Sequence, residues 1–174
     1  DAGADGGWII TGTNGTTYQF GLNHSDSTPS ILGKWGGGWG RMYLTIVKDS
    51  HGNEIRYDYD WHPADSQNFT SDAYLQLISY PGGTVKFNWQ DRADPYALSV
   101  PTPNLSTGGM NTGITVTRRL ASIEVGFGAG NLIRRYELGY TDSPTTPLRH
   151  SPVSQLTSVT VKGADGTTVL PPTT

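Results

Sequence analysis

Four aromatic residues have the type and setting that carbohydrate binding requires. Trp35 and Trp39 lie in a glycine-rich run, KWGGGWG at residues 34–40, whose glycines provide no side chain to cover them. Tyr43 follows closely, and Tyr96 lies in a second region, rich in proline. An exposed aromatic ring offers a flat apolar surface on which a sugar ring stacks, while neighbouring polar groups bind its hydroxyls. Trp35, Trp39, Tyr43 and Tyr96 are therefore candidate carbohydrate-binding residues.

These aromatic residues also have a structural interpretation. Trp35 and Trp39 fit equally well as apolar plugs that cover an open end of a sheet. Four further aromatics occur in alternating strand-like runs, where burial in a core is the stronger expectation: Tyr57, Tyr59, Trp61 and Trp89.

The sequence contains no metal-binding motif. It has no cysteine, and His24, His51, His62 and His150 show no HxxxH spacing, so we expect no zinc site and four exposed loop histidines. Asp49 with Asn53, and Asp165 before Gly166, carry oxygen atoms that suit calcium. The same residues are typical of ordinary β-turns, which we favour. We expect no cofactor, with calcium as the alternative.

No motif selects a catalytic set. The GxSxG signature of serine hydrolases is absent. A glycosidase needs two facing carboxylates, and fifteen acidic residues offer pairs without selecting one. We expect no catalytic residue, and keep a polysaccharide-active enzyme as a second alternative to a binding or structural module.

Composition narrows the class of protein. The chain has 174 residues, a net charge of −3 and only 16% charged residues, so one module spanning residues 1–174 is expected. No basic run exceeds two residues, as at Arg118-Arg119, which argues against nucleic-acid binding. No apolar stretch is long enough to span a membrane.

Five pairs of strand-like runs, each separated by a turn signal, position these residues. The clearest is residues 54–61, where Ile55, Tyr57 and Tyr59 alternate with charged residues. The predicted hairpins are 8–11 with 16–20, 41–48 with 54–61, 73–80 with 84–89, 114–126 with 131–140, and 156–161 with 167–170. They predict an all-β antiparallel meander with little or no helix, forming a sandwich, a barrel or a curved sheet.

Two regions interrupt this pattern and are predicted as long loops. They are residues 23–40, which contain Trp35 and Trp39, and residues 91–112, which contain Tyr96. In the fourth hairpin, a turn at residues 127–130 would place Ile123, Val125, Leu132, Tyr136 and Leu138 on one face of the sheet.

Seven blocks of the chain, in this order, form a recognisable pattern: residues 8–21, 43–61, 74–80, 85–94, 119–125, 132–141 and 155–173. The most specific are DxxGNxIxYxY at residues 49–59 and GADGTTxLPPT at residues 163–173. Together they resemble the N-terminal region of SpvB-type virulence proteins, which also opens the B components of bacterial toxin complexes and many secreted YD-repeat (Rhs-like) proteins. The resemblance spans nearly the whole chain.

The resemblance implies a noncatalytic, β-rich part of a large secreted bacterial polypeptide that helps to build a shell or scaffold. Its partners would be other domains of the parent polypeptide, at a secreted or cell-surface location. The glycine-flanked Trp35 and Trp39 depart from this pattern, so a carbohydrate-binding module that targets a larger protein to a glycan is the main alternative.

Overall fold

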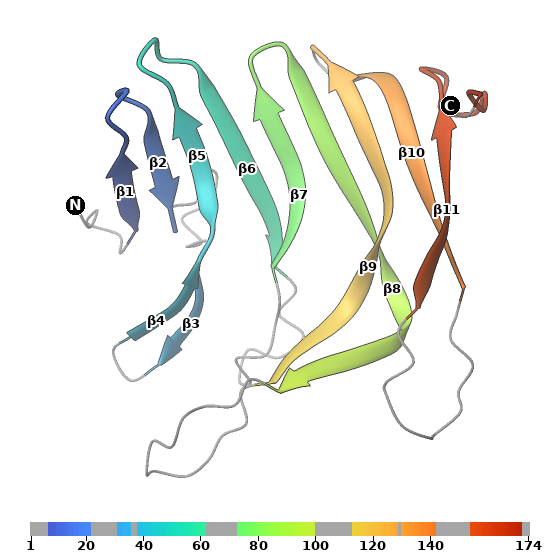
Figure 1. The fold of residues 1–174 in the computed structure, drawn as a ribbon, viewed down its shortest axis with the longest axis horizontal. Coiled ribbons are helices and arrows are strands. Elements are labelled where there is room, and N and C mark those ends of the chain that lie inside the picture. The colour runs from blue at the N-terminus through green and yellow to red at the C-terminus, as the bar shows by residue number, and fades with distance from the viewer. Residues whose placement is uncertain are drawn as a thin grey trace.

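The computed structural model describes residues 7–21, 31–35, 38–61, 73–99, 113–128, 130–141 and 154–171. Within these residues the chain is all-β (Figure 1). Its strands are β1 (Trp8–Thr11), β2 (Thr17–Phe20), β3 (Ile31–Trp35), β4 (Gly38–Met42), β5 (Leu44–Lys48), β6 (Glu54–Trp61), β7 (Ala73–Tyr80), β8 (Gly83–Ser99), β9 (Gly113–Phe127), β10 (Asn131–Thr141) and β11 (Gln155–Lys162).

Nine of the strands form one open antiparallel sheet. Their order is β1-β2-β5-β6-β7-β8-β9-β10-β11, so each strand pairs with the next one along the chain except where β3 and β4 form a separate two-stranded sheet. The meander predicted from the sequence is confirmed, and of the three predicted forms the curved sheet is the one observed. β1 and β11 lie at opposite ends of the sheet and do not close it into a barrel (Figure 1).

Short turns set the register of the hairpins. Between β5 and β6, the Asp49 carboxylate accepts hydrogen bonds from the backbone N–H groups of His51 and Asn53, at 2.8 and 2.9 Å. Gly52 has a φ of 90°, a conformation that residues with a Cβ rarely adopt. The turns predicted at Asn14-Gly15, His51-Gly52 and Asp165-Gly166 are confirmed. The fifth hairpin is shorter than predicted, because β11 is followed by only one bridge, Lys162 to Val169.

The prediction of two long loops is partly wrong. Residues 31–35 and 38–42 pair as β3 and β4, with Trp35 opposite Gly38 and Lys34 opposite Trp39. Residues 91–99 continue β8, with Tyr96 opposite Val116. Glycine and proline lower the strand propensity of both regions, but pairing with a neighbouring strand overrides that local preference. The remaining residues of the two predicted loops lie outside the described ranges.

Bulges shift the register at several points. The predicted strand 41–48 is divided at Tyr43 into the end of β4 and the start of β5. Between β9 and β10 a shift places Leu132 opposite Gly126 and Arg134 opposite Val125. The prediction that Leu132 shares the face of Val125 is therefore wrong, because a bulge reverses the alternation from that point on.

Candidate functional site

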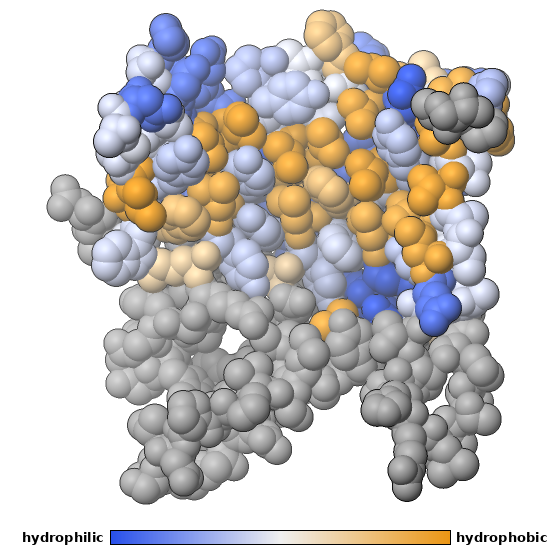
Figure 2. Space-filling model, viewed as in Figure 1, coloured by the Kyte–Doolittle hydropathy of each residue, from blue (hydrophilic) through white to orange (hydrophobic). Residues whose placement is uncertain are grey.

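The sheet has one apolar face, defined here by three rows of cross-strand neighbours. Ile10, Tyr18, Val47 and Ile55 form the first row, Tyr57, Ile78, Val85 and Val125 the second, and Phe87, Ile123, Tyr136 and Val161 the third. Paired residues of an antiparallel ladder point to the same side, so these rows lie on one surface. Figure 2 shows the apolar residues as a band across the sheet from β1 to β11.

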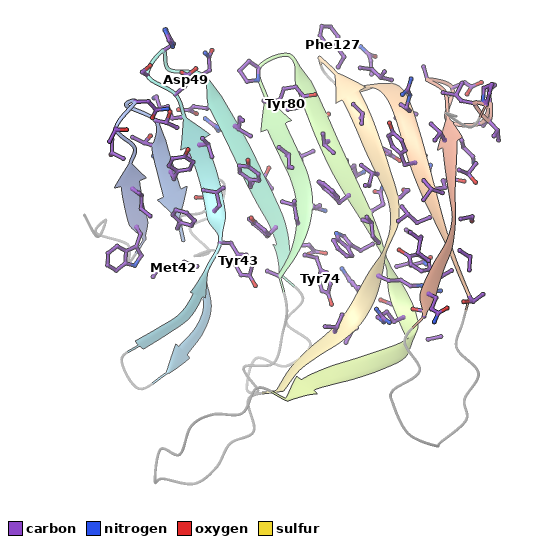
Figure 3. All side chains as sticks on the ribbon, in the orientation of Figure 1. Met42, Tyr43, Asp49, Tyr74, Tyr80 and Phe127 are labelled. Carbon is purple, nitrogen blue, oxygen red and sulfur yellow. The ribbon has the colours of Figure 1, made fainter. Side chains whose placement is uncertain are left out.

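Large side chains that lie two residues along a strand from a member of these rows point to the same apolar face, and several of them are exposed. Phe127 is 63% exposed, Trp8 54%, Val159 53% and Tyr80 40%. Tyr80 and Phe127 lie together at the upper end of the face in Figure 3, and both are opposite Gly83 in the ladder. Within the described part of the chain, the buried large hydrophobic residues are Ile46 and Tyr74. The described residues therefore leave much of the apolar face uncovered.

The opposite face, called here the polar face, carries ion pairs between neighbouring strands. Arg135 lies between Glu124 and Glu137, at 3.6 and 3.3 Å, and Lys162 is 2.8 Å from Glu137. A hydrogen bond from Lys162 is the main reason that the pKa of Glu137 is lowered. Such partly exposed pairs add little stability, but their charges favour contact with water. The sheet is thus amphipathic, with its polar face suited to solvent.

A second set of ion pairs continues the polar face near the other end of the sheet. Glu54 lies 3.2 Å from Lys48 and 2.9 Å from Arg56. Hydrogen bonds from Arg56 and then from Lys48 lower the pKa of the Glu54 carboxyl. The two charged groups are separated by neutral residues such as Ser79 and Thr84, which pair with each other.

A packed cluster around Tyr74 links four strands, β6 to β9, below the apolar band. The Tyr74 hydroxyl on β7 accepts hydrogen bonds from the backbone N–H groups of Thr117 and Arg118 on β9, at 3.1 and 3.2 Å. The Tyr74 ring is 4.9 Å from that of Trp89. Arg118 also donates to Asp60 on β6 at 2.8 Å. These contacts reach across β8, at the position where the β8–β9 register shifts between Asp91 and Tyr96.

Tyr43 and Tyr59 form a second aromatic contact, with ring centroids 5.0 Å apart. The Tyr59 hydroxyl donates to the Leu44 carbonyl at 3.0 Å. Burial, together with the nearby Tyr57 and Tyr43, raises the pKa of Tyr59 to about 12. Tyr43, one of the four candidate carbohydrate-binding residues, is therefore half-buried in a structural contact.

The four candidate carbohydrate-binding residues are divided between two sheets. Trp35 and Trp39 belong to the β3–β4 hairpin, Tyr43 lies between β4 and β5, and Tyr96 is on β8. The structure describes the backbone of Trp35, Trp39 and Tyr96 but not their side chains, so their role as a sugar-binding set stays a prediction. Of the predicted core aromatics, Tyr57, Tyr59 and Trp89 are half-buried, and the side chain of Trp61 is outside the described part.

Both candidate calcium sites are hydrogen-bonded turns. The Asp49 carboxylate accepts from Asn53 Nδ2 at 2.8 Å, in addition to its two backbone bonds. Asp165 accepts from the backbone N–H groups of Thr167 and Thr168, at 3.0 and 2.8 Å, and from the Thr168 hydroxyl. Among the described residues there is no cluster of three potential metal ligands. Calcium binding stays a prediction, and the turn interpretation accounts for these contacts.

Comparisons with known proteins add to this geometry at the level of fold. No family model matches the sequence, and no curated protein matches it. Among solved structures, the N-terminal domain of effector protein SpvB from Salmonella typhimurium strain LT2 matches with a TM-score of 0.67 and 14% identity, over 92% of this chain and 62% of that one. The chain has the fold of that domain. The sequence resemblance to SpvB-type proteins is thereby confirmed as a resemblance in fold.

Two toxin-complex structures also match. A crystal structure of TcdB2-TccC3 matches with a TM-score of 0.63 and 15% identity, and the Tc holotoxin pore of Photorhabdus luminescens with 0.58 and 15%. Each match covers 94% of this chain and 10% of the longer one. The chain thus spans 62% of the SpvB domain and a tenth of the toxin-complex chains.

Sequence reasoning did not identify the exposed residues of the apolar face as functional. Ile10, Tyr18, Val85 and Ile123 were visible as members of alternating runs. Alternation indicates which side of a strand is apolar, but it does not show what covers that side. Among the residues that the structure describes, there is no helix of the length and apolarity that a membrane span needs.

Proposed function

We propose that the chain is a noncatalytic structural module of a larger, secreted, toxin-like polypeptide, in which another part of that polypeptide covers the apolar face. The observation that carries this proposal is the amphipathic single-layer sheet, whose apolar face is exposed at Trp8, Tyr80, Phe127 and Val159. Monomeric soluble proteins rarely leave a contiguous apolar patch of more than a few hundred Å² in water. An uncovered face of this kind is typical of an interaction surface.

The energetics favour covering this face. Burial of apolar surface contributes about 25 cal/mol per Å². A partner that covers several large side chains therefore gains several kcal/mol of binding free energy, before the costs of association are subtracted. The polar face offers no comparable gain, because Glu124, Arg135, Glu137 and Lys162 already pair with one another across three strands. The expected orientation therefore has the apolar face inside the assembly and the polar face in water.

Similar folds in longer chains support this role. The SpvB domain extends beyond the matched part, and the TcdB2-TccC3 chain is about ten times as long as the matched region. A sheet of this kind is therefore compatible with a position inside a large polypeptide. We extend the same argument to location and propose a secreted or cell-surface protein.

Hydroxyl-radical footprinting of the monomeric chain tests whether the apolar face is open. We expect rapid oxidation of Tyr80 and Phe127 and slow oxidation of Tyr74, which is 5% exposed and serves as the buried control. The double change Tyr80→Ser with Phe127→Ser should reduce the binding of a hydrophobic dye. The matched change Lys86→Ser, at an exposed position of the polar face, should leave dye binding unchanged.

Protection of Tyr80 and Phe127 in the monomer would contradict the proposal, because it would mean that the chain covers its own apolar face. A screen of the same chain against a glycan array and polysaccharide substrates tests the alternatives. Saturable binding to a glycan would favour the carbohydrate-binding module, and turnover of a polysaccharide would favour the enzyme.

A further inference from the structure

Of the two strands at the ends of the described nine-stranded sheet, β11 is the longer. β11 has eight residues and forms one end of the strand order, whereas β1 at the other end has four. Figure 1 shows β11 as the outermost strand, beyond β10. Along its length Leu156 and Val159 are 52% and 53% exposed. A long edge with unpaired backbone groups is a template for strand addition.

The backbone of β11 identifies which groups point outward. The Val161 carbonyl accepts a hydrogen bond at 2.8 Å from the N–H of Leu170, a residue that returns along the outer side of β11. Antiparallel residues alternate between those that bond to the inner neighbour and those that do not. The pairing with β10 is regular from Ser158 to Lys162. Val159, two residues before Val161, therefore also directs its N–H and C=O outward.

The chain itself forms one backbone bridge on the outer side of β11. The bridge between Lys162 and Val169 occupies the C-terminal end of the edge, and among the described residues no strand pairs with the outer side of residues 155–160. Those six residues, QLTSVT, contain no charge and no proline, two of the features with which natural edge strands prevent pairing. A register shift between Leu156 and Ser158 leaves Ser158 to Thr160 as the regular part of this edge. The only charged residue of β11 is Lys162, at the occupied end.

We propose that the open edge of β11 at residues 155–160 binds an extended strand from another segment of the larger polypeptide, a proposal that rests on the proposed function. The added strand would alternate apolar and polar residues. Along the regular part of β11 its apolar side chains would continue the face that carries Val159, and its polar ones would lie beside Ser158 and Thr160.

The size of the edge favours a tethered segment over a second copy of the chain. Six strand residues span only about 20 Å. Pairing of two copies through one strand each would bury far less than the ~1,200 Å² typical of a stable interface. A segment of the same polypeptide needs no such area, because the connection gives it an effective concentration in the millimolar range.

Amide exchange with a synthetic strand tests the proposal on the whole 174-residue chain. The probe is an eight-residue peptide that alternates valine with threonine, and the control peptide carries lysine in place of each valine. We expect the first peptide, at millimolar concentration, to slow exchange of the Val159 amide by about tenfold or more, since that amide gains a hydrogen bond. The lysine peptide should have no effect.

Two proline variants provide the matched control. Val159→Pro removes an outward N–H, so it should abolish peptide binding while the melting temperature stays within about 2 °C of the wild type. Thr160→Pro removes an N–H that points toward β10, where Thr160 is opposite Glu137, and should lower the melting temperature by several degrees.

Three results would overturn the proposal. They are an unchanged exchange rate at Val159 with saturating peptide, undiminished peptide binding by Val159→Pro, and dimers of the chain that Val159→Pro abolishes, which would assign the edge to a second copy. The oxidation rates of Tyr80 and Phe127 in the footprinting experiment do not depend on the edge of β11. Failure of strand addition is therefore distinguishable from failure of the proposed function.

Discussion

Tyr74 is the best-buried aromatic residue that the structure describes, and its hydroxyl links β7 to β9. A tyrosine contributes a large apolar ring and one polar group, and the polar group of a buried tyrosine requires a partner. Here the partners are two backbone N–H groups, at a point where the β8–β9 ladder is shifted. The Tyr74 hydroxyl therefore provides an acceptor for the N–H groups of Thr117 and Arg118 at this irregular point of the ladder.

Tyr74→Phe should lower the free energy of unfolding by about 1–3 kcal/mol, the cost of leaving buried N–H groups without an acceptor. Tyr18→Phe is the control, because Tyr18 is exposed on the same sheet and should tolerate the change within about 0.5 kcal/mol. Urea titration of both variants measures the difference. Equal losses would show that the Tyr74 hydroxyl does not stabilise the fold.

The raised pKa of Tyr59 makes stability depend on alkaline pH. Its folded pKa of about 12 lies above the ordinary value of 10.0, because burial disfavours the phenolate. The contribution of neutral Tyr59 is therefore complete below pH ~10 and is lost as the pH rises through about 12. Across this pH interval the free energy of unfolding should fall as the pH rises in the wild type. It should fall less steeply in Tyr59→Phe. The same slope in both proteins would contradict this prediction.

At the scale of single elements, the β3–β4 hairpin is the part of the fold that departs most from the sequence prediction. Trp35 and Gly38 form the pair nearest its connection, and Gly36 and Gly37 separate them in the sequence. Two glycines between paired residues are a common hairpin signal. The sequence predicts a loop here because the glycine run interrupts the pattern of strand-like runs.

The hairpin allows a direct test of the carbohydrate prediction. If Trp35 and Trp39 bind a sugar, Trp35→Ala and Trp39→Ala should each weaken glycan binding by about 1–3 kcal/mol and leave the melting temperature nearly unchanged. If the rings are apolar plugs, each change should lower the melting temperature by several degrees without affecting any glycan. Calorimetric titration and thermal unfolding of both variants separate the two outcomes.

The two faces of β6 should respond differently to mutation. Tyr57→Ala removes a half-buried ring from the apolar face and should cost about 1–3 kcal/mol. Arg56→Ala removes an exposed side chain that pairs with Glu54 and should cost no more than about 1 kcal/mol. Denaturant titration of both variants checks this, and similar losses would mean that the alternation along β6 does not separate the two faces.

At the scale of the whole molecule, the described residues form one curved layer rather than two packed layers. Most domains bury the apolar face of a sheet against a second layer. Here the apolar face runs without a second described layer from Trp8 on β1 to Val159 on β11 (Figure 2). This feature is the basis for placing the chain inside a larger assembly, with both the face and the β11 edge available for contact.

The fold class and most of the hairpins are predictable from the amino-acid sequence alone. Alternation in residues 54–61 and turn signals such as Asn14-Gly15 and His51-Gly52 act over a few residues, so they are readable without tertiary information. The resemblance to SpvB-type proteins was also visible in the order of the strand blocks, and the fold comparison confirms it.

Features that depend on residues far apart in the sequence became visible in the three-dimensional structure. Pairing with β4 and β9 makes strands of glycine- and proline-rich regions, and a bulge moves Leu132 away from the side of Val125. The sequence also predicted a buried core from Tyr57, Tyr59 and Trp89, which the structure leaves half-buried. Local pattern shows which side of a strand is apolar, whereas coverage of that side depends on whether another layer packs against it.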